Sequence, residues 1–442
     1  MRVSFGSGGC PSLAGNSLVN NSLVRGGRSC AAAIATLLSA GAAGAAGFDT
    51  PILYTARHQG MGGAAIGYVD DPSAAYHNPA GLQGVNGLAF LGDVSMIMAH
   101  VTGSPASTAS ASGIQSQLVV APFFLAAAAY RVHPWLSAGV AVFPVASGGA
   151  DYEYAVPGSE TYQLNSTTIA FYEVTPLLSL NVPEDALLPG RLSFGVGYRA
   201  TIATFERQQG ERDNPRGLDM ALSGNDFEGL RVGMQYRLGD TVSIGAVYRN
   251  KVRVVTRGDE ATVLGQPATG VALPFILPAQ AGAGIRTDFR RLGVAFDAVY
   301  TFQSQNDRTE LTGSIAGNPA RVPNVFAWRD AFTLRFGVEF RLGPAEEVPL
   351  RVGYIYDAQV SNRQYPSAFA TPPAPTRTLT LGTGYDSGAW EVNLALALRG
   401  GSTDISSAEL APPTSCPTCG FAGEYAITTT GVYVDFSTDI EL

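Results

Sequence analysis

The residues with the most reactive side chains lie near the C-terminal end of the sequence. Cys416 and Cys419 stand in "SCPTCG", and this C-x-x-C spacing suits a redox pair, half of a metal site or a local disulfide. A zinc site needs a second pair, and a redox site needs a helix N-terminus that lowers a thiol pKa, and the sequence shows neither. We therefore predict a local disulfide, formed in an oxidising compartment.

Other patterns that support catalysis or cofactor binding are weak. "GMGGAA" (60–65) matches G-x-G-x-x-A, but the preceding "YTARHQ" is polar and no βαβ unit surrounds it. The four histidines show no metal-ligand spacing, and we expect His77 and His133 at turns or rims. Asp70 and Asp71 fall in a predicted turn, where we expect them to be solvated. The sequence thus predicts no enzyme, no cofactor and no metal.

The composition favours a protein whose outer surface meets lipid. Charged residues make up 14% of the chain, against roughly 25% in soluble globular proteins. Glycine is abundant, with 52 residues in 442. The net charge of -8 argues against nucleic acid as a partner, because phosphate binding needs a basic face.

The first 47 residues have the features of an export signal. Arg25 and Arg28 precede "SCAAAIATLLSAGAAGAAG", an apolar stretch rich in small residues that ends in A-x-A-like sites. A transmembrane anchor is the alternative, and the stretch is long enough for one. Further along, nothing approaches 18 consecutive apolar residues, so no helical span is expected.

From residue 87 onward the dominant pattern has a period of two. "RLSFGVGYRATIATF" (191–205), "TLRFGVEFRL" (333–342) and "EVNLALALR" (391–399) each alternate large apolar residues with small or charged ones. Such alternation indicates strands with one apolar and one polar face.

Fourteen segments show this pattern, and most reach the ~9–11 residues that cross a bilayer as a tilted strand. They are 88–101, 117–131, 136–145, 169–180, 191–205, 228–238, 241–257, 279–287, 291–303, 331–342, 348–360, 376–385, 389–400 and 425–442. Short turns alternate with long connections, namely 102–116, 146–168, 206–227, 258–278, 304–330, 361–375 and 401–424. The sequence therefore predicts an all-β fold, a 14-stranded antiparallel transmembrane β-barrel over 88–442. A soluble sandwich or propeller is the alternative, but fourteen long strands without a repeat fit neither.

The cost of charge in lipid decides which face points outward. A charged side chain at mid-membrane on the lipid face costs roughly 2–4 kcal/mol, so the Leu, Val and Phe rows must face lipid. The charged residues on the other face must then point into the lumen or towards the rims: Arg199, Arg249, Asp297, Arg335, Glu339, Arg351 and Glu391. The arginines Arg199, Arg249, Arg335 and Arg351 are candidate contacts for a ligand carboxylate, unless each pairs with an acid in the lumen.

Residues 48–87 precede the first strand and are rich in small residues between Gly60 and Gly67. A barrel of fourteen strands encloses a lumen that needs filling. We predict that 48–87 forms an N-terminal hatch inside the barrel.

This stretch resembles the start of the FadL/TodX family of outer-membrane transporters of hydrophobic compounds. The similar features are "AGF" at the predicted mature N-terminus, the Gly/Ala-rich run, an acidic residue and then "NPAG" before the first strand. Two later blocks, 277–305 and 332–359, also look like this family. The resemblance implies a barrel closed by a hatch that contains Asn78, Pro79 and Ala80. It further implies a monomer in the outer membrane of a Gram-negative bacterium that passively takes up long-chain fatty acids or aromatic hydrocarbons.

In that family a kink in the third strand opens the barrel wall sideways, so that ligand leaves into the membrane. The third strand here contains Gly139, Pro144 and Gly148, and proline cannot donate a ladder hydrogen bond. Either the wall opens there, or Pro144 merely ends the strand. For the entry route, we expect an apolar groove in the long loops that includes "VALPFILPA" (271–279). The alternative function is a FadL-like barrel that acts in secretion or attachment of proteins at the cell surface.

Overall fold

The structure is a computed structural model of the chain. It describes residues 53–105, 113–155, 161–182, 189–263, 265–369, 371–412 and 420–440. The predicted export signal, the first residues of the predicted hatch, and Cys416 and Cys419 lie outside the described residues, so the predicted disulfide stays a prediction.

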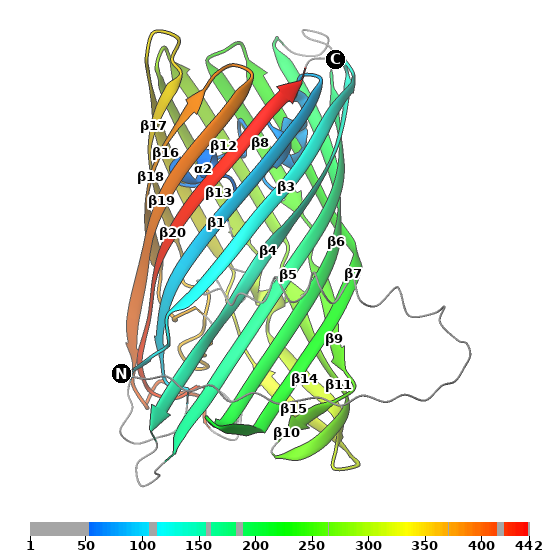
Figure 1. The fold of residues 1–442 in the computed structure, drawn as a ribbon, viewed down its shortest axis with the longest axis vertical. Helices are drawn as coiled ribbons and strands as arrows, with labels where there is room; N and C mark the ends of the chain where they lie inside the picture. Colours follow the sequence, from blue (N-terminus) through cyan, green and yellow to red (C-terminus); the bar gives the residue numbers. More distant parts are fainter. Residues whose placement is uncertain are drawn as a thin grey trace, which may run out of the picture. The chain divides into compact units, whose positions relative to one another are not determined.

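The described chain forms one antiparallel β-sheet that closes on itself (Figure 1). Its segments are β1 (Leu88–Gly103), β2 (Ile114–Gln115), β3 (Val119–His133), β4 (Leu136–Ala155), β5 (Tyr162–Asn181), β6 (Arg191–Glu211), β7 (Asn214–Leu238), β8 (Val242–Arg249), β9 (Val252–Gly258), β10 (Ala261–Val263), β11 (Gln266–Leu277), β12 (Gln280–Phe289), β13 (Leu292–Thr301), β14 (Arg308–Ile315), β15 (Asn318–Val325), β16 (Ala331–Leu342), β17 (Val348–Asp357), β18 (Thr376–Asp386), β19 (Trp390–Ile405) and β20 (Gly423–Ile440).

Several of these segments lie in line and act as one strand of the wall. β2 continues β3, β9 and β10 continue β8, and the pairs β11/β12, β13/β14 and β15/β16 each form one strand. The described segments therefore make fourteen strands around the ring, and β1 pairs with β20 from Leu88↔Ile440 to Thr102↔Ala426 to close it. The predicted 14-stranded antiparallel barrel is confirmed.

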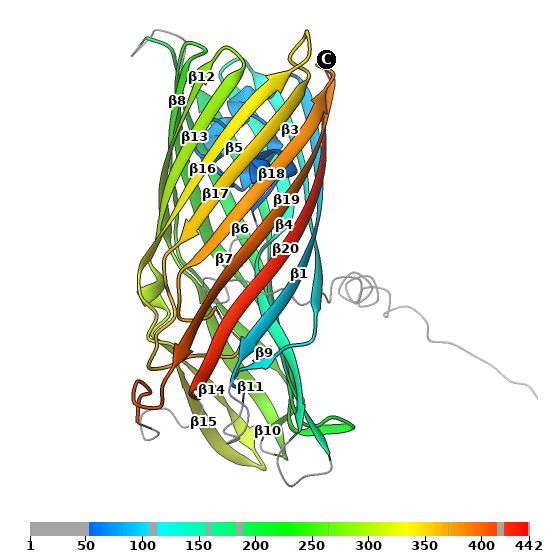
Figure 2. The same ribbon diagram turned by 90° about the vertical axis from the view of Figure 1, so that its left-hand side faces the viewer.

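The two ends of the barrel differ: the predicted short turns are present at one end, but most of the predicted long loops at the other end are not. Short turns join β3 to β4, β7 to β8, β12 to β13 and β18 to β19 at the end where Leu88 and Ile440 lie. At the other end the predicted loops 146–168, 206–227, 258–278 and 304–330 are largely wrong, because β4 to β7, β9 to β11, β14 and β15 extend through them (Figure 2). Bacterial outer-membrane barrels have short periplasmic turns, so the extended end is the outer one.

The outward face of the barrel is apolar. The rows predicted to face lipid are exposed, for example Phe194 and Val196 on β6, Phe336 on β16 and Leu396 on β19. The charged residues predicted to face inward are buried, among them Arg199, Asp297 and Glu339, except Glu391, which is partly exposed. Among the described residues, no helix has the length and apolar character needed to span a membrane.

The N-terminal segment, residues 53–87, lies inside the barrel near the short-turn end (Figure 1). It contains the helix α2 (Ala56–Gly60) and two 3-10 turns, η2 (Pro72–Ala75) and η3 (Pro79–Gly84). Nearly all of its residues are buried, and they contact strands on several sides of the ring.

Candidate functional site

The barrel wall carries glycines where the N-terminal segment touches it. They face each other in pairs on neighbouring strands, and we call them the glycine belt: Gly195 with Gly233, Gly245 with Gly284, and Gly337 with Gly353. A Cβ atom on Gly353 would lie 2.1 Å from the amide nitrogen of Gly62, and one on Gly337 would lie 2.3 Å from the carbonyl oxygen of Met61. Because no side chain fits in that space, glycine allows the backbone of the segment to lie directly on the wall.

The predicted motif Asn78, Pro79 and Ala80 holds η3 on this wall. Asn78 is the N-cap, and its Oδ1 accepts from the Ala80 amide at 3.2 Å, while Pro79 occupies the first helical position. The Asn78 Nδ2 donates to the carbonyl oxygens of Ile66 at 2.8 Å and of Met234, on β7, at 3.0 Å. The Ala80 carbonyl accepts from the Ser179 hydroxyl of β5 at 3.0 Å. The motif thus folds the segment and also attaches it to the barrel.

Two aspartates at the closing seam cap α2. Asp93 on β1 and Asp435 on β20 stand directly opposite each other in register. Asp93 accepts from the Ala56 amide at 3.1 Å, and Asp435 accepts from the Arg57 amide at 2.8 Å. These amides are the first of the helix, which have no partner within it. This contact was not predicted from the sequence, although both aspartates lie on the inward face of their strands.

The prediction that Asp70 and Asp71 are solvated is wrong, because both carboxylates face Arg57. The Arg57 Nη1 lies 2.9 Å from Asp70 and 3.5 Å from Asp71. Burial alone would raise the pKa of Asp70, but the guanidinium groups of Arg57 and Arg237 together outweigh it and hold that pKa below its usual value. His77 lies in the bend between η2 and η3, as the turn prediction has it, but it is buried with its ring nitrogen Nε2 against the Tyr54 carbonyl and is not at a rim.

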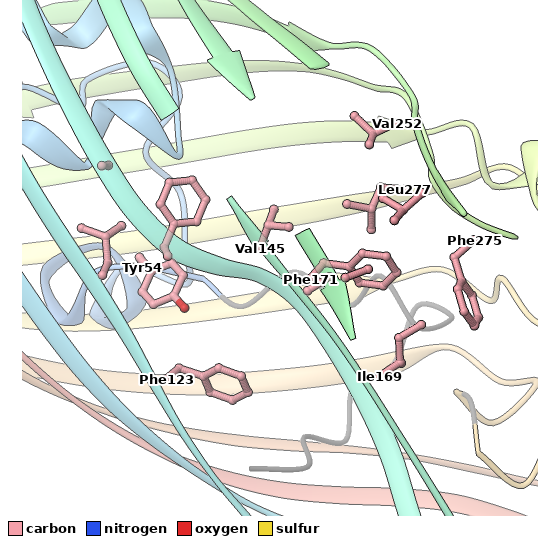
Figure 3. Packing of buried hydrophobic residues seen from close by; sticks show 14 of the residues in the cluster. Tyr54, Phe123, Val145, Ile169, Phe171, Val252, Phe275 and Leu277 are labelled. Carbon is pink, nitrogen blue, oxygen red and sulfur yellow. The ribbon is translucent and has the colours of Figure 1, made fainter. Parts of the chain in front are cut away.

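An apolar cluster fills the middle of the lumen. It contains Phe143, Phe171, Phe205, Val252, Phe275 and Leu277, and all are buried. Figure 3 shows Phe171, Val252, Phe275 and Leu277, which come from three different strands, gathered in one region of the lumen. The prediction of an apolar loop over 271–279 is wrong. Most of that stretch belongs to β11, whose side chains from Val271 to Leu277 alternate into this cluster.

A basic pocket lies between the N-terminal segment and the wall strands β7, β8, β12, β13 and β16, and Tyr76 in its lining packs against the apolar cluster. It is partly open to solvent, and its polar lining consists of Arg231, Arg249, Arg335, Tyr76, His77 and Gln280. The Arg335 side chain is buried, and its Nη1 is 3.4 Å from the carbonyl oxygen of Gly63. Arg231 was missed from the sequence, although it shares the inward face of β7 with Gly233.

The other two predicted arginines lie elsewhere and contact acids, as Arg231 of the pocket also does, since its Nη2 lies 3.4 Å from the Glu173 carboxylate. The Arg199 Nε donates to Glu173 at 2.8 Å, and the Arg351 Nε donates to Glu339 at 2.7 Å. The structure therefore brings together Arg249 and Arg335 of the predicted set, adds Arg231, and does not place Arg199 or Arg351 in the lining of the pocket.

The ladder between β3 and β4 is incomplete. It runs from His133↔Leu136 to Ala126↔Val142. The next backbone hydrogen bond between these two parts of the wall joins the Gln117 amide to the Asp151 carbonyl at 2.8 Å. Within the described stretch 113–155, residues 118–125 and 143–150 therefore have no ladder partner across this boundary. We call this stretch of wall the β3–β4 break.

The three residues predicted for a kink have different places in this strand. Pro144 lies at a register shift against β5, and its carbonyl accepts from the Tyr54 hydroxyl at 3.0 Å. The strand continues to Ala155, so the alternative that Pro144 ends it is wrong. Gly139 lies within the regular ladder and pairs with both neighbouring strands, whereas Gly148 lies in the break and pairs with Ile169 of β5.

An apolar outer wall, a closed ring of antiparallel strands and a filled lumen define a transmembrane barrel of the outer-membrane type. The family model described as outer membrane protein transport protein (OMPP1/FadL/TodX) matches residues 36–396 of the chain. The chain belongs to this family. Its members are transport proteins and not enzymes, and the protein is located in the outer membrane.

Solved structures share the fold at low sequence identity. A Pseudomonas aeruginosa FadL homologue superposes with a TM-score of 0.67 at 15% identity, over 89% of this chain and 100% of that one. The Pseudomonas putida toluene transporter TodX gives 0.65 at 16%, over 88% and 99%. The Ralstonia pickettii toluene transporter TbuX gives 0.62 at 15%, over 88% and 98%. Comparison with curated protein sequences gives no match.

Proposed function

We propose that this barrel passively takes up a hydrophobic compound, either a long-chain fatty acid or an aromatic hydrocarbon. The observation that carries the proposal is the apolar cluster in the middle of the lumen, where a transmembrane pore for polar solutes would present polar side chains. Transfer of a ligand from water into such surroundings is favourable by about 0.8 kcal/mol for each buried CH₂ group. No other energy source is needed for entry.

The basic pocket supports a fatty acid as the ligand. A fatty acid has an apolar chain, which suits the apolar cluster, and a carboxylate, which suits Arg231, Arg249 and Arg335 in a pocket whose Tyr76 packs against that cluster. The fold shared with TodX and TbuX supports an aromatic hydrocarbon. A hydrocarbon would use the cluster and make no charged contact in the pocket.

In this proposal the N-terminal segment is a hatch and the β3–β4 break is the exit. The glycine belt, the Asn78 contacts and the two aspartates of the seam hold the segment at the periplasmic end, which supports its role as a hatch. The break lies beside the apolar cluster, since Phe123 and Val145 belong to both. A ligand that left there would pass from an apolar lumen into lipid without crossing a polar surface.

The test is to identify ligand in the protein purified from membranes in mild detergent, and to measure uptake of labelled oleate and toluene by cells with and without the gene. Co-purified fatty acid or hydrocarbon together with gene-dependent uptake is the expected result, and it names the ligand. If the protein carries neither compound and uptake does not depend on the gene, the proposal is wrong. The alternative role in secretion or attachment of proteins at the cell surface would then be the one to test.

Arg335→Gln should separate the two ligand classes. If a carboxylate sits in the basic pocket, loss of one charged donor should weaken oleate binding by about 10- to 100-fold, because hydrogen bonds to charged groups contribute roughly 1.5–3 kcal/mol. Toluene uptake should stay unchanged. Binding to the purified protein is measured by calorimetry, and Arg212→Gln, at a side chain 57% exposed to solvent, is the matched control. Equal loss of oleate and toluene would show that the variant acts through the fold and not through a carboxylate.

A further inference from the structure

The connection between β17 and β18 runs through the lumen instead of projecting outward. Its described residues, 358–369 and 371–375, include the buried side chains Val360, Ser361, Ala368 and Thr371. We call this connection the crossing loop. Figure 1 shows chain between β17 and β18 inside the ring of strands, at the end opposite the N-terminal segment.

The contacts of the crossing loop show that it spans the bore. The Phe369 ring lies under the guanidinium of Arg207 on β6, 4.3 Å from its Cζ, and packs edge-on against Tyr152 of β4 at 5.4 Å. The Tyr152 hydroxyl donates to the Ala368 carbonyl at 2.6 Å. In the ring of fourteen, β6 is the fifth strand, and β17 and β18 are the eleventh and twelfth. A loop that starts between β17 and β18 and contacts β6 therefore crosses the bore to the opposite wall.

One arginine fastens the crossing loop to the rim. The Arg363 guanidinium donates to the Glu409 carboxylate at 2.8 Å, to the Thr403 hydroxyl at 2.6 Å and to the Asp404 carbonyl at 2.7 Å. The hydrogen bond from Arg363 is the main cause that lowers the pKa of Glu409, to about 2. The carboxylate is therefore ionised, and the contact is complete, at neutral and mildly acidic pH.

The crossing loop and the N-terminal segment lie on opposite sides of the apolar cluster. Ala368 packs against Ala99, Val101 and Ile427, which are near the outer ends of β1 and β20. The N-terminal segment contacts Asp93 and Asp435, nearer the periplasmic ends of the same strands. The start of the loop, at Val360, packs on the apolar cluster itself. The loop thus contacts the cluster at Val360, and its Ala368 lies farther outward along β1 and β20 than the aspartates that hold the N-terminal segment.

We propose that the crossing loop is an outer gate, which must leave the bore before a compound reaches the apolar cluster, with Arg363 as its latch. This gate is distinct from the hatch at the periplasmic end. Its role in uptake rests on the proposed function, but its control of access to the cluster can be measured without transport.

A disulfide tests the gate in transport. A Cβ built on Gly103 of β1 lies 3.0 Å from the Cβ of Ala368, so a small shift of the loop brings a pair of cysteines to the ~3.5–4.5 Å that a disulfide needs. Gly103→Cys/Ala368→Cys is made in a Cys416→Ser/Cys419→Ser background, with each single cysteine as control. Oxidised protein should lose at least nine-tenths of its uptake of oleate and toluene, and reduction should restore it. Equal uptake by the oxidised and reduced forms would overturn the gate.

Thiol labelling tests the gate without transport. Ala203→Cys, in the same background, places a small reporter within the apolar cluster on β6. Adding Arg363→Ala should speed its labelling by an externally added maleimide about tenfold, while Arg308→Ala, at a highly exposed ion pair, should not. If the cysteine is labelled at the same rate in all three proteins, Arg363 does not hold the crossing loop closed. If labelling is gated but the wild-type protein takes up neither compound, the proposed function fails and the gate stands. The mobility shift of the heated barrel on a gel confirms that every variant is folded.

Discussion

Gly353→Ala should detach the N-terminal segment from the barrel wall while the barrel itself stays intact. The new methyl group would lie 2.1 Å from the Gly62 amide nitrogen and 2.5 Å from the Thr380 hydroxyl. The Gly62 backbone must move, and it carries the Gly62 amide away from its 3.2 Å hydrogen bond to that hydroxyl. Overpacking of this kind costs roughly 1–3 kcal/mol, which corresponds to about a 5- to 150-fold larger population of the detached segment.

Trypsin provides the measurement, because Arg57 lies within the segment and is protected while the segment is docked. Purified Gly353→Ala should be cut after Arg57 at least fivefold faster than wild type, and the cut is located by mass spectrometry. Gly92→Ala is the matched control, since a Cβ on Gly92 of β1 meets no atom within 4 Å. Equal cleavage of the two variants would mean that the glycine belt does not control docking.

The strands within the membrane were predictable from the sequence because their two faces meet different surroundings. Lipid outside and a polar or packed lumen inside impose alternation, as in Phe194 and Val196 against Gly195 and Gly197. All fourteen predicted segments correspond to strands. The extensions of β4 to β7 were missed because a strand that rises above the bilayer meets water outside. Around Gln208 and Asp219 both faces are polar, and the pattern then resembles that of a loop.

The candidate site was predictable only in part, for a different reason. Alternation places Arg199, Arg231, Arg249, Arg335 and Arg351 inside the barrel, but it does not say which of them meets an acid. Glu173 lies on the strand beside β6, and Glu339 on the strand beside β17, so the partners depend on register between strands. Register also decides where the β3–β4 ladder stops. Pro144 marks the region, but the first unpaired position follows from the pairing of Ala126 with Val142.

Glu339→Gln should be the most destabilising single change in the barrel wall. Glu339 is buried, and its carboxylate contacts three guanidinium groups, those of Arg286 at 2.8 Å, Arg351 at 2.7 Å and Arg341 at 3.1 Å. Removal of one partner from a buried ion pair costs roughly 3–5 kcal/mol, because the charge that remains is buried without compensation. Asp288 and Glu391 still face Arg286 and Arg351, so we expect a loss near the lower limit, about 3 kcal/mol.

The loss is measured as the free energy of unfolding in urea from lipid vesicles, followed by the fluorescence of the three tryptophans. Glu310→Gln is the control, because Glu310 forms an exposed pair with Arg321 and such pairs contribute about 0–1 kcal/mol. Adding Arg286→Gln to Glu339→Gln should cost less than the sum of the two single changes, since it removes the charge left without its partner. Strict additivity would mean that the two groups do not interact. Because Glu339 lies two residues from Gly337 of the glycine belt, this variant should also increase cleavage at Arg57, and that result would couple the buried charges of the wall to docking of the N-terminal segment.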